Sequence, residues 1–279
     1  MIVSELLARV KAMLKAANKP VSEAYILAEN ALGLAREQLL IYTDTKIDHK
    51  RQMRLLTDTH KRCSGYPLQY IIGSWEFYGL NFKVDERVLI PRADTEILVD
   101  YLLQNHKKIN RLIDLCCGSG CIGLTFCKKT GTKTLLLDIS KGAIEVCRQN
   151  ARALQIEKDV EIIQKDILEG PLPQLILKAG DVIVSNPPYI KSSHIAKLQN
   201  ELKYEPILAL DGAEDGLKFY RALIFKWAKD MPKGVKMVVE TGYDTFSEVE
   251  GLFRQAGFKD ITRGYDYNKI VRMLSVSKD

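Results

Sequence analysis

The segment RLIDLCCGSGCIG, residues 111–123, decides the fold. Its first five residues are mostly apolar, which is the pattern of a short buried strand. The apolar residues that follow predict a helix over residues 119–129. Glycine lets a backbone approach a ligand closely, and a helix N-terminus offers free N–H groups. The turn between strand and helix carries three glycines at the spacing G-x-G-x-x-G, namely Gly118, Gly120 and Gly123.

The chain after residue 110 repeats this alternation of strands and helices. We expect strands at residues 111–115, 134–138, 160–164, 181–185 and 235–240 with a closing pair near 259–262 and 270–275, and helices at 119–129, 141–154, 215–230 and 246–255. This order predicts an α/β protein with a mostly parallel sheet and helices on both faces. Because such sheets bind ligands beyond the carboxyl ends of their strands, we expect the chemistry just after the first four strands.

The first 73 residues instead predict a small helical bundle. Apolar residues at helical spacing indicate helices over residues 4–14, 22–33, 36–42 and 48–63. We expect Ser4 to cap the first helix. In the last helix we expect Met53, Leu56 and Cys63 on one side and the basic residues, Arg62 among them, elsewhere. These basic residues form either a docking face or ordinary solvated surface.

Residues 74–92 join the two parts. Alternating aromatic and β-branched residues around Gly79 predict a β-hairpin, and this segment ends at Pro91-Arg92. A helix follows, with Asp94 or Thr95 near its start. We therefore divide the chain into a helical substrate-docking domain at residues 1–73, a hairpin connector at 74–92 and an α/β domain at 93–279.

The composition is that of an ordinary globular protein, with 279 residues, 46% apolar and 27% charged side chains and a net charge of +6. No apolar run approaches the ~20 residues that span a bilayer. The N-terminus lacks the uninterrupted apolar core of a secretory signal, so we expect a cytoplasmic protein. The cysteines Cys116, Cys117 and Cys121 lie close together, but no second pair completes a zinc site. We therefore expect buried thiols and no metal.

The glycine-rich loop and two later carboxylates form a candidate cofactor site. Asp138 follows Gly118 by twenty residues, at the end of the next strand, where a carboxylate can accept from both ribose hydroxyls of a nucleoside. Asp166 ends the third strand, where it either accepts from an adenine amine, with Ile167 packed on the ring, or only caps a turn. The loop by itself suits NAD and S-adenosylmethionine equally well, and a tight turn without a ligand is a third interpretation.

The tetrapeptide Asn186-Pro187-Pro188-Tyr189 follows the fourth strand and separates these alternatives. Its prolines fix φ and stiffen the turn, so that the Asn186 side-chain carbonyl and the Pro187 carbonyl form a rigid pair of acceptors. Two such acceptors fit a planar –NH2 group with its two donors, and Tyr189 supplies an aromatic face to stack on it. An NAD enzyme has no use for this arrangement, whereas an enzyme that methylates a planar nitrogen does.

A planar nitrogen is a poor nucleophile because its lone pair is delocalised. Hydrogen bonds that favour a pyramidal nitrogen localise the lone pair during attack on the methyl group, so they stabilise the transition state more than the ground state. The displacement is in-line, and alignment of nitrogen and methyl carbon within about 3–3.5 Å is the other main contribution. No general base need act early, because the extra proton leaves after the nitrogen has become cationic.

These residues resemble the N-P-P-Y amino-methyltransferases, and the wider chain is similar to the HemK/PrmC family of glutamine methyltransferases that modify peptide chain release factors. The similarity runs from about residue 60 to residue 275 and rests on short segments in combination. The matching segments are residues 70–73, 75–79, 88–92, 94–96, 186–190, 204–206, 208–210, 215–217, 220–221 and 240–242.

The resemblance implies a Rossmann-like class I methyltransferase fold. It implies methyl transfer from S-adenosyl-L-methionine to the side-chain amide nitrogen of the glutamine in the Gly-Gly-Gln loop of release factors. In this family Asn186, Pro187 and Tyr189 would carry the catalysis, and Pro188 and Arg92 would help to bind the substrate. The cofactor positions would be Asp114, Cys116, Cys117, Gly118, Ser119, Gly120, Asp138, Asp166, Ile167 and Asn186.

The resemblance also implies partners and a setting. The helical domain would help to grip the release factor, and translation termination in the cytoplasm would be the process served. We expect a monomer that does not contact a membrane.

The chain departs from the family pattern at four positions. Cys116 stands at a usual glycine, Ala93 at a usual proline, Asp211 at the first of two usual glycines and Thr245 where glutamine is common. None of these four positions lies in the tetrapeptide. We therefore expect the departures to change the affinity for ligands more than the type of reaction.

The main alternative function is a nucleic-acid amino-methyltransferase acting on adenine or guanine, because a base amine is also a planar –NH2 group. Such an enzyme normally needs a base-flipping and sequence-reading apparatus, and no separate recognition domain follows residue 120. A third possible function is a scaffold that only binds the cofactor. In such a protein the tetrapeptide would have no catalytic role.

Overall fold

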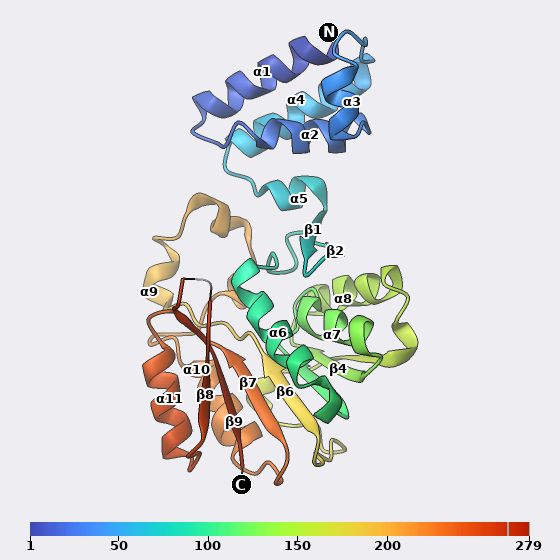
Figure 1. The fold of residues 1–279 in the computed structure, drawn as a ribbon. Helices are drawn as coiled ribbons and strands as arrows, with labels where there is room; N and C mark the ends of the chain where they lie inside the picture. Colours follow the sequence, from blue (N-terminus) through green and yellow to red (C-terminus); the bar gives the residue numbers. More distant parts are fainter. Residues whose placement is uncertain (267, 279) are drawn as a thin grey trace. The chain divides into compact units, whose positions relative to one another are not determined.

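The computed structural model describes residues 1–266 and 268–278, with the side chain of residue 106 left aside. The chain forms two compact units: residues 1–74 together with 199–204 make the first, and the remainder makes the second. Figure 1 shows the first unit as a group of helices and the second as a sheet flanked by helices. Among the described residues, no helix has the length and apolar character needed to cross a membrane.

The first unit is the helical bundle that the sequence predicts. Its helices are α1 Val3–Ala16, α2 Glu23–Leu32, α3 Arg36–Ile41, α4 His49–Cys63 and the unpredicted short α5 Leu68–Ile72. Asp48 caps α4 by accepting from the backbone N–H of Arg51 at 3.0 Å. The predicted cap of α1 is wrong, because the N-cap is Ile2 and the Glu5 carboxylate, not Ser4, accepts from the Ile2 N–H at 3.1 Å.

The buried face of α4 also differs from the prediction. Met53 is 49% exposed, whereas Leu56 and Cys63 are partly buried and pack against the bundle core as predicted. The fully buried residues of α4 are Leu55, Thr59 and Arg62. The Arg62 guanidinium donates to both carboxylate oxygens of Glu23, at 2.6 and 2.9 Å, and pairs with Glu201 at 2.8 Å. A buried charge is tolerated when it is paired in this way. Helical periodicity does not predict the burial of Arg62, because Glu23 and Glu201, the carboxylates that pair with it, both lie outside α4.

The second unit is built on a seven-stranded sheet in the order β5-β4-β3-β6-β7-β9-β8. Its strands are β3 Arg111–Leu115, β4 Lys133–Asp138, β5 Val160–Gln164, β6 Asp181–Ser185, β7 Lys236–Glu240, β8 Ile261–Tyr265 and β9 Val271–Ser277. Strands β3 to β7 are parallel, and β9 is antiparallel to both of its neighbours. The predicted mostly parallel sheet is confirmed. Strand order reverses between β3 and β6, which is the switch point where such sheets bind ligands.

Helices cover both faces of this sheet (Figure 1). They are α6 Glu96–Gln104, α7 Cys121–Thr130, α8 Lys141–Ala153, the short α9 Ser192–Ile195, α10 Lys218–Ala222, which continues as a π-helix over Leu223–Ala228, and α11 Phe246–Gln255. Alternate strand residues point to opposite faces. On β3, Leu112 joins the core under α6 and α7, and Ile113 joins the core under α10 and α11.

The predicted hairpin consists of β1 Ser74–Phe77 and β2 Leu80–Lys83. Its two-residue turn places Tyr78 at φ 53° and Gly79 at φ 73°, the left-handed conformation that tight hairpins require. The buried rings of Phe77 and Phe82 meet edge to face, with centroids 6.1 Å apart. The Asn150 side chain accepts from the Lys83 N–H at 2.7 Å, which fastens the hairpin to α8.

Candidate active site

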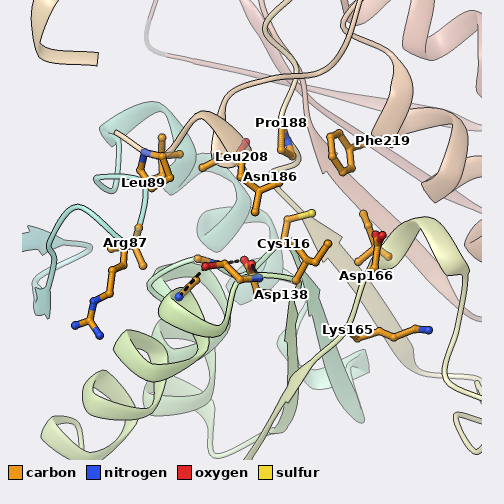
Figure 2. Close-up of a pocket in the computed structure, with 18 residues that line it drawn as sticks. Arg87, Leu89, Cys116, Asp138, Lys165, Asp166, Asn186, Pro188, Leu208 and Phe219 are labelled. Carbon is orange, nitrogen blue, oxygen red and sulfur yellow. Dashed lines mark hydrogen bonds between the residues drawn. The ribbon is translucent and has the colours of Figure 1, made fainter. Parts of the chain in front are cut away.

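An open pocket lies at the carboxyl ends of β3, β4, β5 and β6, where the sequence predicts the chemistry. Figure 2 shows the side chains that surround it. The predicted site residues that line it are Cys116, Gly118, Asp138, Asp166, Ile167, Asn186 and Pro188. The predicted residues that do not line it are Arg92, Asp114, Cys117, Ser119, Gly120, Pro187 and Tyr189.

The loop after β3 gives position 116 a backbone conformation that favours glycine, the residue that the resemblance implies there. Cys116 has φ 60°, a left-handed conformation that a residue with a Cβ adopts at a cost. The thiol lies at the pocket, and burial raises its pKa well above the ordinary value. A Cβ added at Gly120 would lie 2.7 Å from Cys147 Sγ and Leu124 Cδ1, so glycine is required for the loop to pack on α8.

Asp138 is held rigidly at the end of β4. Its Oδ2 accepts from the Gly118 N–H and its Oδ1 from the Ser140 N–H, each at 2.9 Å (Figure 2). Burial raises the pKa of this carboxyl, and these backbone N–H groups oppose the rise. A carboxylate has about four acceptor positions, so both oxygens keep capacity for a ligand hydroxyl.

Asp166 caps a turn, as one of its two interpretations predicts, and its predicted contact to an adenine amine stays a prediction. Its Oδ1 accepts from the Leu168 N–H at 2.8 Å and caps the 3-10 turn Ile167–Glu169, yet the residue also lines the pocket. Ile167 is buried beside it. Phe219, from α10, lines the pocket as well, and Figure 2 shows its ring above Asp166.

The two cationic side chains at the pocket are both engaged by neighbouring carboxylates. Arg87 pairs with Asp85 at 2.6 Å, and Lys165 pairs with Glu169. Two carboxylates, Asp138 and Asp166, therefore face the pocket while its cations are neutralised nearby, which favours a cationic ligand.

The tetrapeptide loop is fixed on both sides. Before it, the Ser185 hydroxyl donates to the Leu115 carbonyl at 2.7 Å and ties β6 to β3. After it, Ile190 forms a parallel bridge with Asp211. Gly212 packs against the loop, because an added Cβ there would lie 2.8 Å from Tyr189 Cα. The loop therefore has little freedom to change shape.

In the part of the chain that the structure describes, the Asn186 side-chain amide of this loop is hydrogen-bonded through its nitrogen only. Its Nδ2 donates to Thr95 Oγ1 at 3.2 Å. Among the described residues, no donor is hydrogen-bonded to Asn186 Oδ1 or to the Pro187 carbonyl. These are the two acceptors that the sequence predicts for a planar –NH2 group, and Asn186 lines the pocket.

The side chain of Tyr189, the last residue of the tetrapeptide, lies near a buried carboxylate. Its Oη lies 3.5 Å from Glu240 Oε1, at the end of β7. Burial raises the pKa of Glu240 to about 7, although the Thr95 hydroxyl and Arg272 oppose the rise. Burial likewise raises the pKa of the Tyr189 phenol, so its hydroxyl stays protonated at neutral pH.

Arg92 pairs with Glu205, and the other oxygen of this carboxylate accepts from the Ile90 N–H at 3.0 Å. Glu205 is almost fully buried, so it anchors the start of the segment that supplies Leu208 to the pocket. The resemblance includes this segment, but the sequence did not place it at the pocket. In all, the pocket residues that the sequence did not predict are Arg87, Val88, Leu89, Ile139, Ser140, Ala143, Lys165, Pro206, Leu208, Ala209 and Phe219.

Asp114 lies beneath the glycine-rich loop, fully buried. Its Oδ2 accepts from the Gly123 N–H at 2.9 Å, and its Oδ1 is buried without a hydrogen-bond partner. Burial raises its pKa to about 7. Cys117 and Ser119 are also buried, and the Cys117 N–H donates to the Leu137 carbonyl at 3.0 Å. These residues support the loop from below.

The other departures from the family pattern are accommodated locally. Ala93 begins the 3-10 turn that leads into α6, a position that favours proline but does not require it. Asp211 accepts from the Ser192 hydroxyl at 2.7 Å and from the Ala213 N–H at 2.9 Å, so it forms its own turn. The Thr245 hydroxyl donates to the Gly242 carbonyl at 3.4 Å at the start of α11.

Comparison with known proteins identifies the relatives of this chain. The family profile described as the PrmC N-terminal domain matches residues 5–73, and the profile described as the methyltransferase small domain matches residues 92–203. The chain is 35% identical to the release factor glutamine methyltransferase of Clostridium acetobutylicum over 283 residues, which cover 98% of each protein. The chain belongs to the release factor glutamine methyltransferase family. It is also 33% identical to the Chlorobaculum tepidum member, over 94% of this chain and 91% of that protein.

Solved structures confirm the class I methyltransferase fold expected for this family. The hMettl16 catalytic domain, solved in complex with MAT2A 3′UTR hairpin 1, has a TM-score of 0.57 and covers 85% of this chain and 83% of that one. The human methyltransferase 10 domain containing protein has a TM-score of 0.52, covering 72% and 90%. Both are 16% identical to this chain, so the likeness extends to the fold alone.

The cofactor of this methyltransferase family is S-adenosylmethionine, and the pocket residues fit it. Asp138, Asp166 and Ile167, the residues for which the sequence predicts contacts to a ribose and an adenine, all line the pocket. The unneutralised carboxylates suit a sulfonium cation. When bound, S-adenosylmethionine supplies an electrophilic methyl group.

Proposed function

We propose that this protein transfers a methyl group from S-adenosylmethionine to the side-chain amide nitrogen of the glutamine in the Gly-Gly-Gln loop of peptide chain release factors. The observation that carries the proposal is the rigid loop after β6. It presents two acceptors, Asn186 Oδ1 and the Pro187 carbonyl, to which no donor of the described residues is hydrogen-bonded, and Asn186 lines the pocket. Relatives over nearly the whole chain are named for this activity.

The chain's own residues perform three tasks in this reaction. Asn186 and Pro187 accept both hydrogens of the amide and so orient its nitrogen, while Pro188 and Tyr189 shape the slot around the planar group. Cys116 to Gly120, Asp138, Asp166 and Ile167 bind the cofactor, either at the pocket or, for Cys117, Ser119 and Gly120, by shaping the loop. Asp114 supports that loop rather than touching the ligand, and Arg92 with Glu205 shapes the substrate side.

The partners follow from the same reading. Release factors are the protein substrate, and the helical domain of residues 1–73, with its basic α4, helps to grip them. The α/β domain carries the site, and every residue lining the pocket belongs to the second unit, which supports action as a monomer. We place the enzyme in the cytoplasm, where translation termination takes place, and assign it no nucleic-acid substrate.

Mass spectrometry of release-factor peptides tests this function. The purified protein is incubated with S-adenosylmethionine and a bacterial release factor, and a matched release factor with the loop glutamine changed to asparagine is the control. One methyl group on the glutamine of the Gly-Gly-Gln peptide is expected, with none on the control. Methyl label in DNA or ribosomal RNA instead would transfer the assignment to the nucleic-acid alternative.

A further inference from the structure

A short turn after β5 carries two residues of the pocket. It is the 3-10 turn Ile167–Glu169, and both Ile167 and the preceding Asp166 line the pocket. Strand β5 lies at the edge of the sheet, and residues 170–180, all of them described, contain no helix or strand. Because 3-10 turns of this length have poor hydrogen-bond geometry, a turn in this position needs support from elsewhere in the fold.

That support comes from the π-helix that continues α10. The buried indole of Trp227 donates from Nε1 to the Ile167 carbonyl at 2.9 Å. The exposed Lys226 donates from Nζ to the next carbonyl, that of Leu168. Two consecutive carbonyls of the turn thus accept from two consecutive side chains of the π-helix. Such helical segments are rare and are frequently found at functional sites.

These contacts hold the turn and leave one of its acceptors for a ligand. The Ile167 carbonyl also accepts from the Gly170 N–H at 3.1 Å, so both of its lone pairs are used. Asp166 Oδ1 accepts from the Leu168 N–H at 2.8 Å. No donor in the described part of the chain is hydrogen-bonded to Asp166 Oδ2, so this oxygen can accept from a ligand.

We propose that Trp227 and Lys226 are positioning residues that hold this turn so that Asp166 Oδ2 accepts from the adenine amine of the cofactor. Neither of them lines the pocket, so they act through Asp166 and Ile167. Phe219, earlier in the same helix, does line the pocket (Figure 2). One continuous helix therefore supplies a wall of the pocket and the support of its acidic turn. The proposal rests on the proposed function, because it takes the cofactor of that function as the ligand.

The adenine amine supplies a direct test. Isothermal titration calorimetry measures the dissociation constants of S-adenosylhomocysteine and of S-inosylhomocysteine, in which an oxygen replaces that amine. The wild type should prefer the amine by at least about tenfold, because the oxygen offers no donor to Asp166. Trp227→Phe keeps an aromatic ring and removes the donor, so it should reduce this preference about fivefold. A role in core packing alone would weaken both ligands equally and leave the preference unchanged.

Lys226→Met tests the outer contact at an exposed position, so it remains informative if Trp227→Phe is poorly folded. It should reduce the preference about twofold, since a carbonyl at the surface that loses its donor can bind water instead. Lys229→Met, three residues further along, is the matched control and should keep the wild-type preference. At saturating cofactor, kcat should stay within about twofold of wild type in all three variants, because Asn186 lies in another loop.

Hydrogen exchange tests the support of the turn without any ligand. Peptides that cover residues 166–170 are followed by mass spectrometry in the ligand-free protein. Exchange of the backbone amides in this turn should be faster in Trp227→Phe and Lys226→Met than in wild type, and unchanged in Lys229→Met. Equal exchange in all four proteins would show that the π-helix does not hold the turn.

The results separate this inference from the function on which it rests. A wild-type protein that prefers the amine, and loses this preference in Trp227→Phe, but leaves release factors unmethylated would contradict the function and support the positioning. A preference that is absent from the wild type, or unchanged in both Trp227→Phe and Lys226→Met, would overturn the inference while methylation stands.

Discussion

The ends of β4 and β6 lie at the same edge of the sheet, yet their polar side chains are held in opposite ways. Both oxygens of Asp138 already accept backbone N–H groups, so this carboxylate is fixed before any ligand arrives. Among the residues that the structure describes, the Asn186 side chain is hydrogen-bonded only through Nδ2, and its carbonyl oxygen can accept from a partner. Under the proposed function the end of β4 binds the cofactor and the end of β6 positions the reacting nitrogen. Substitutions at the end of β4 should therefore change the cofactor dissociation constant, and substitutions at the end of β6 should change kcat.

The largest effect is expected at the β6 end. Asn186→Ala should lower kcat by about 100-fold or more, because one of the two acceptors that localise the nitrogen lone pair is lost. S-adenosylhomocysteine should still bind, with a dissociation constant that isothermal titration calorimetry finds within about threefold of wild type. Full turnover in this variant would contradict the role given to Asn186.

A substitution at the end of β4 should weaken cofactor binding rather than lower turnover. Asp138→Ala should weaken S-adenosylhomocysteine binding about tenfold or more, since it removes the acceptors for the ribose hydroxyls. Turnover at saturating cofactor should change much less. Glu161→Ala, on the exposed side of β5, is the control. An unchanged dissociation constant for Asp138→Ala would show that the ribose lies elsewhere.

Tyr189 offers a smaller test of the β6 end. Tyr189→Phe keeps the aromatic face and removes a hydroxyl that is 3.5 Å from Glu240, so kcat should fall by about threefold at most. Tyr189→Leu removes the face as well and should cost more. Steady-state kinetics on the same release factor compares the two, and equal losses would mean that stacking contributes little.

The smallest effect on the reaction is expected for Asp114, which lies beneath the glycine-rich loop. Here the ionisation of the side chain should make the free energy of unfolding depend on pH. The pKa of Asp114 is about 7 in the folded protein and lies near 3.8 when unfolded, so the folded state binds the proton more tightly. Asp114 therefore lowers the free energy of unfolding as pH rises from about 4 to about 7. Asp114→Asn should lose less stability than wild type between pH 5.5 and 8 in urea titrations. The exposed Asp44→Asn is the control, and an identical pH slope in all three proteins would refute the assignment.

The sequence predicted the elements and the edge of the sheet but not the whole pocket. Strands such as 111–115 and 181–185 follow from short apolar runs, which depend on local pattern alone. The positive φ at Cys116 was not predicted, because cysteine carries no local signal for a left-handed conformation. The Asp138 hydrogen bonds instead join residues twenty apart in the chain.

The features that the sequence did not predict depend on contacts between residues that are distant in the chain. The side of α4 that faces the bundle is set by Arg62 with Glu23 and Glu201, which helical spacing does not reveal. In the same way, Thr95 at the start of α6 comes next to Asn186 after β6 although the two residues lie 91 positions apart in the chain. Phe219 reaches the pocket from a helix that begins three residues later than predicted.

A crystal structure with S-adenosylhomocysteine and a release factor tests the central claim most directly. We predict that Asn186 Oδ1 and the Pro187 carbonyl each accept one hydrogen of the Gly-Gly-Gln side-chain amide, with its nitrogen aimed at the cofactor sulfur and Asn186 Nδ2 on Thr95. A structure in which the Asn186 amide is reversed, or in which the glutamine nitrogen lies away from the sulfur, would contradict the account.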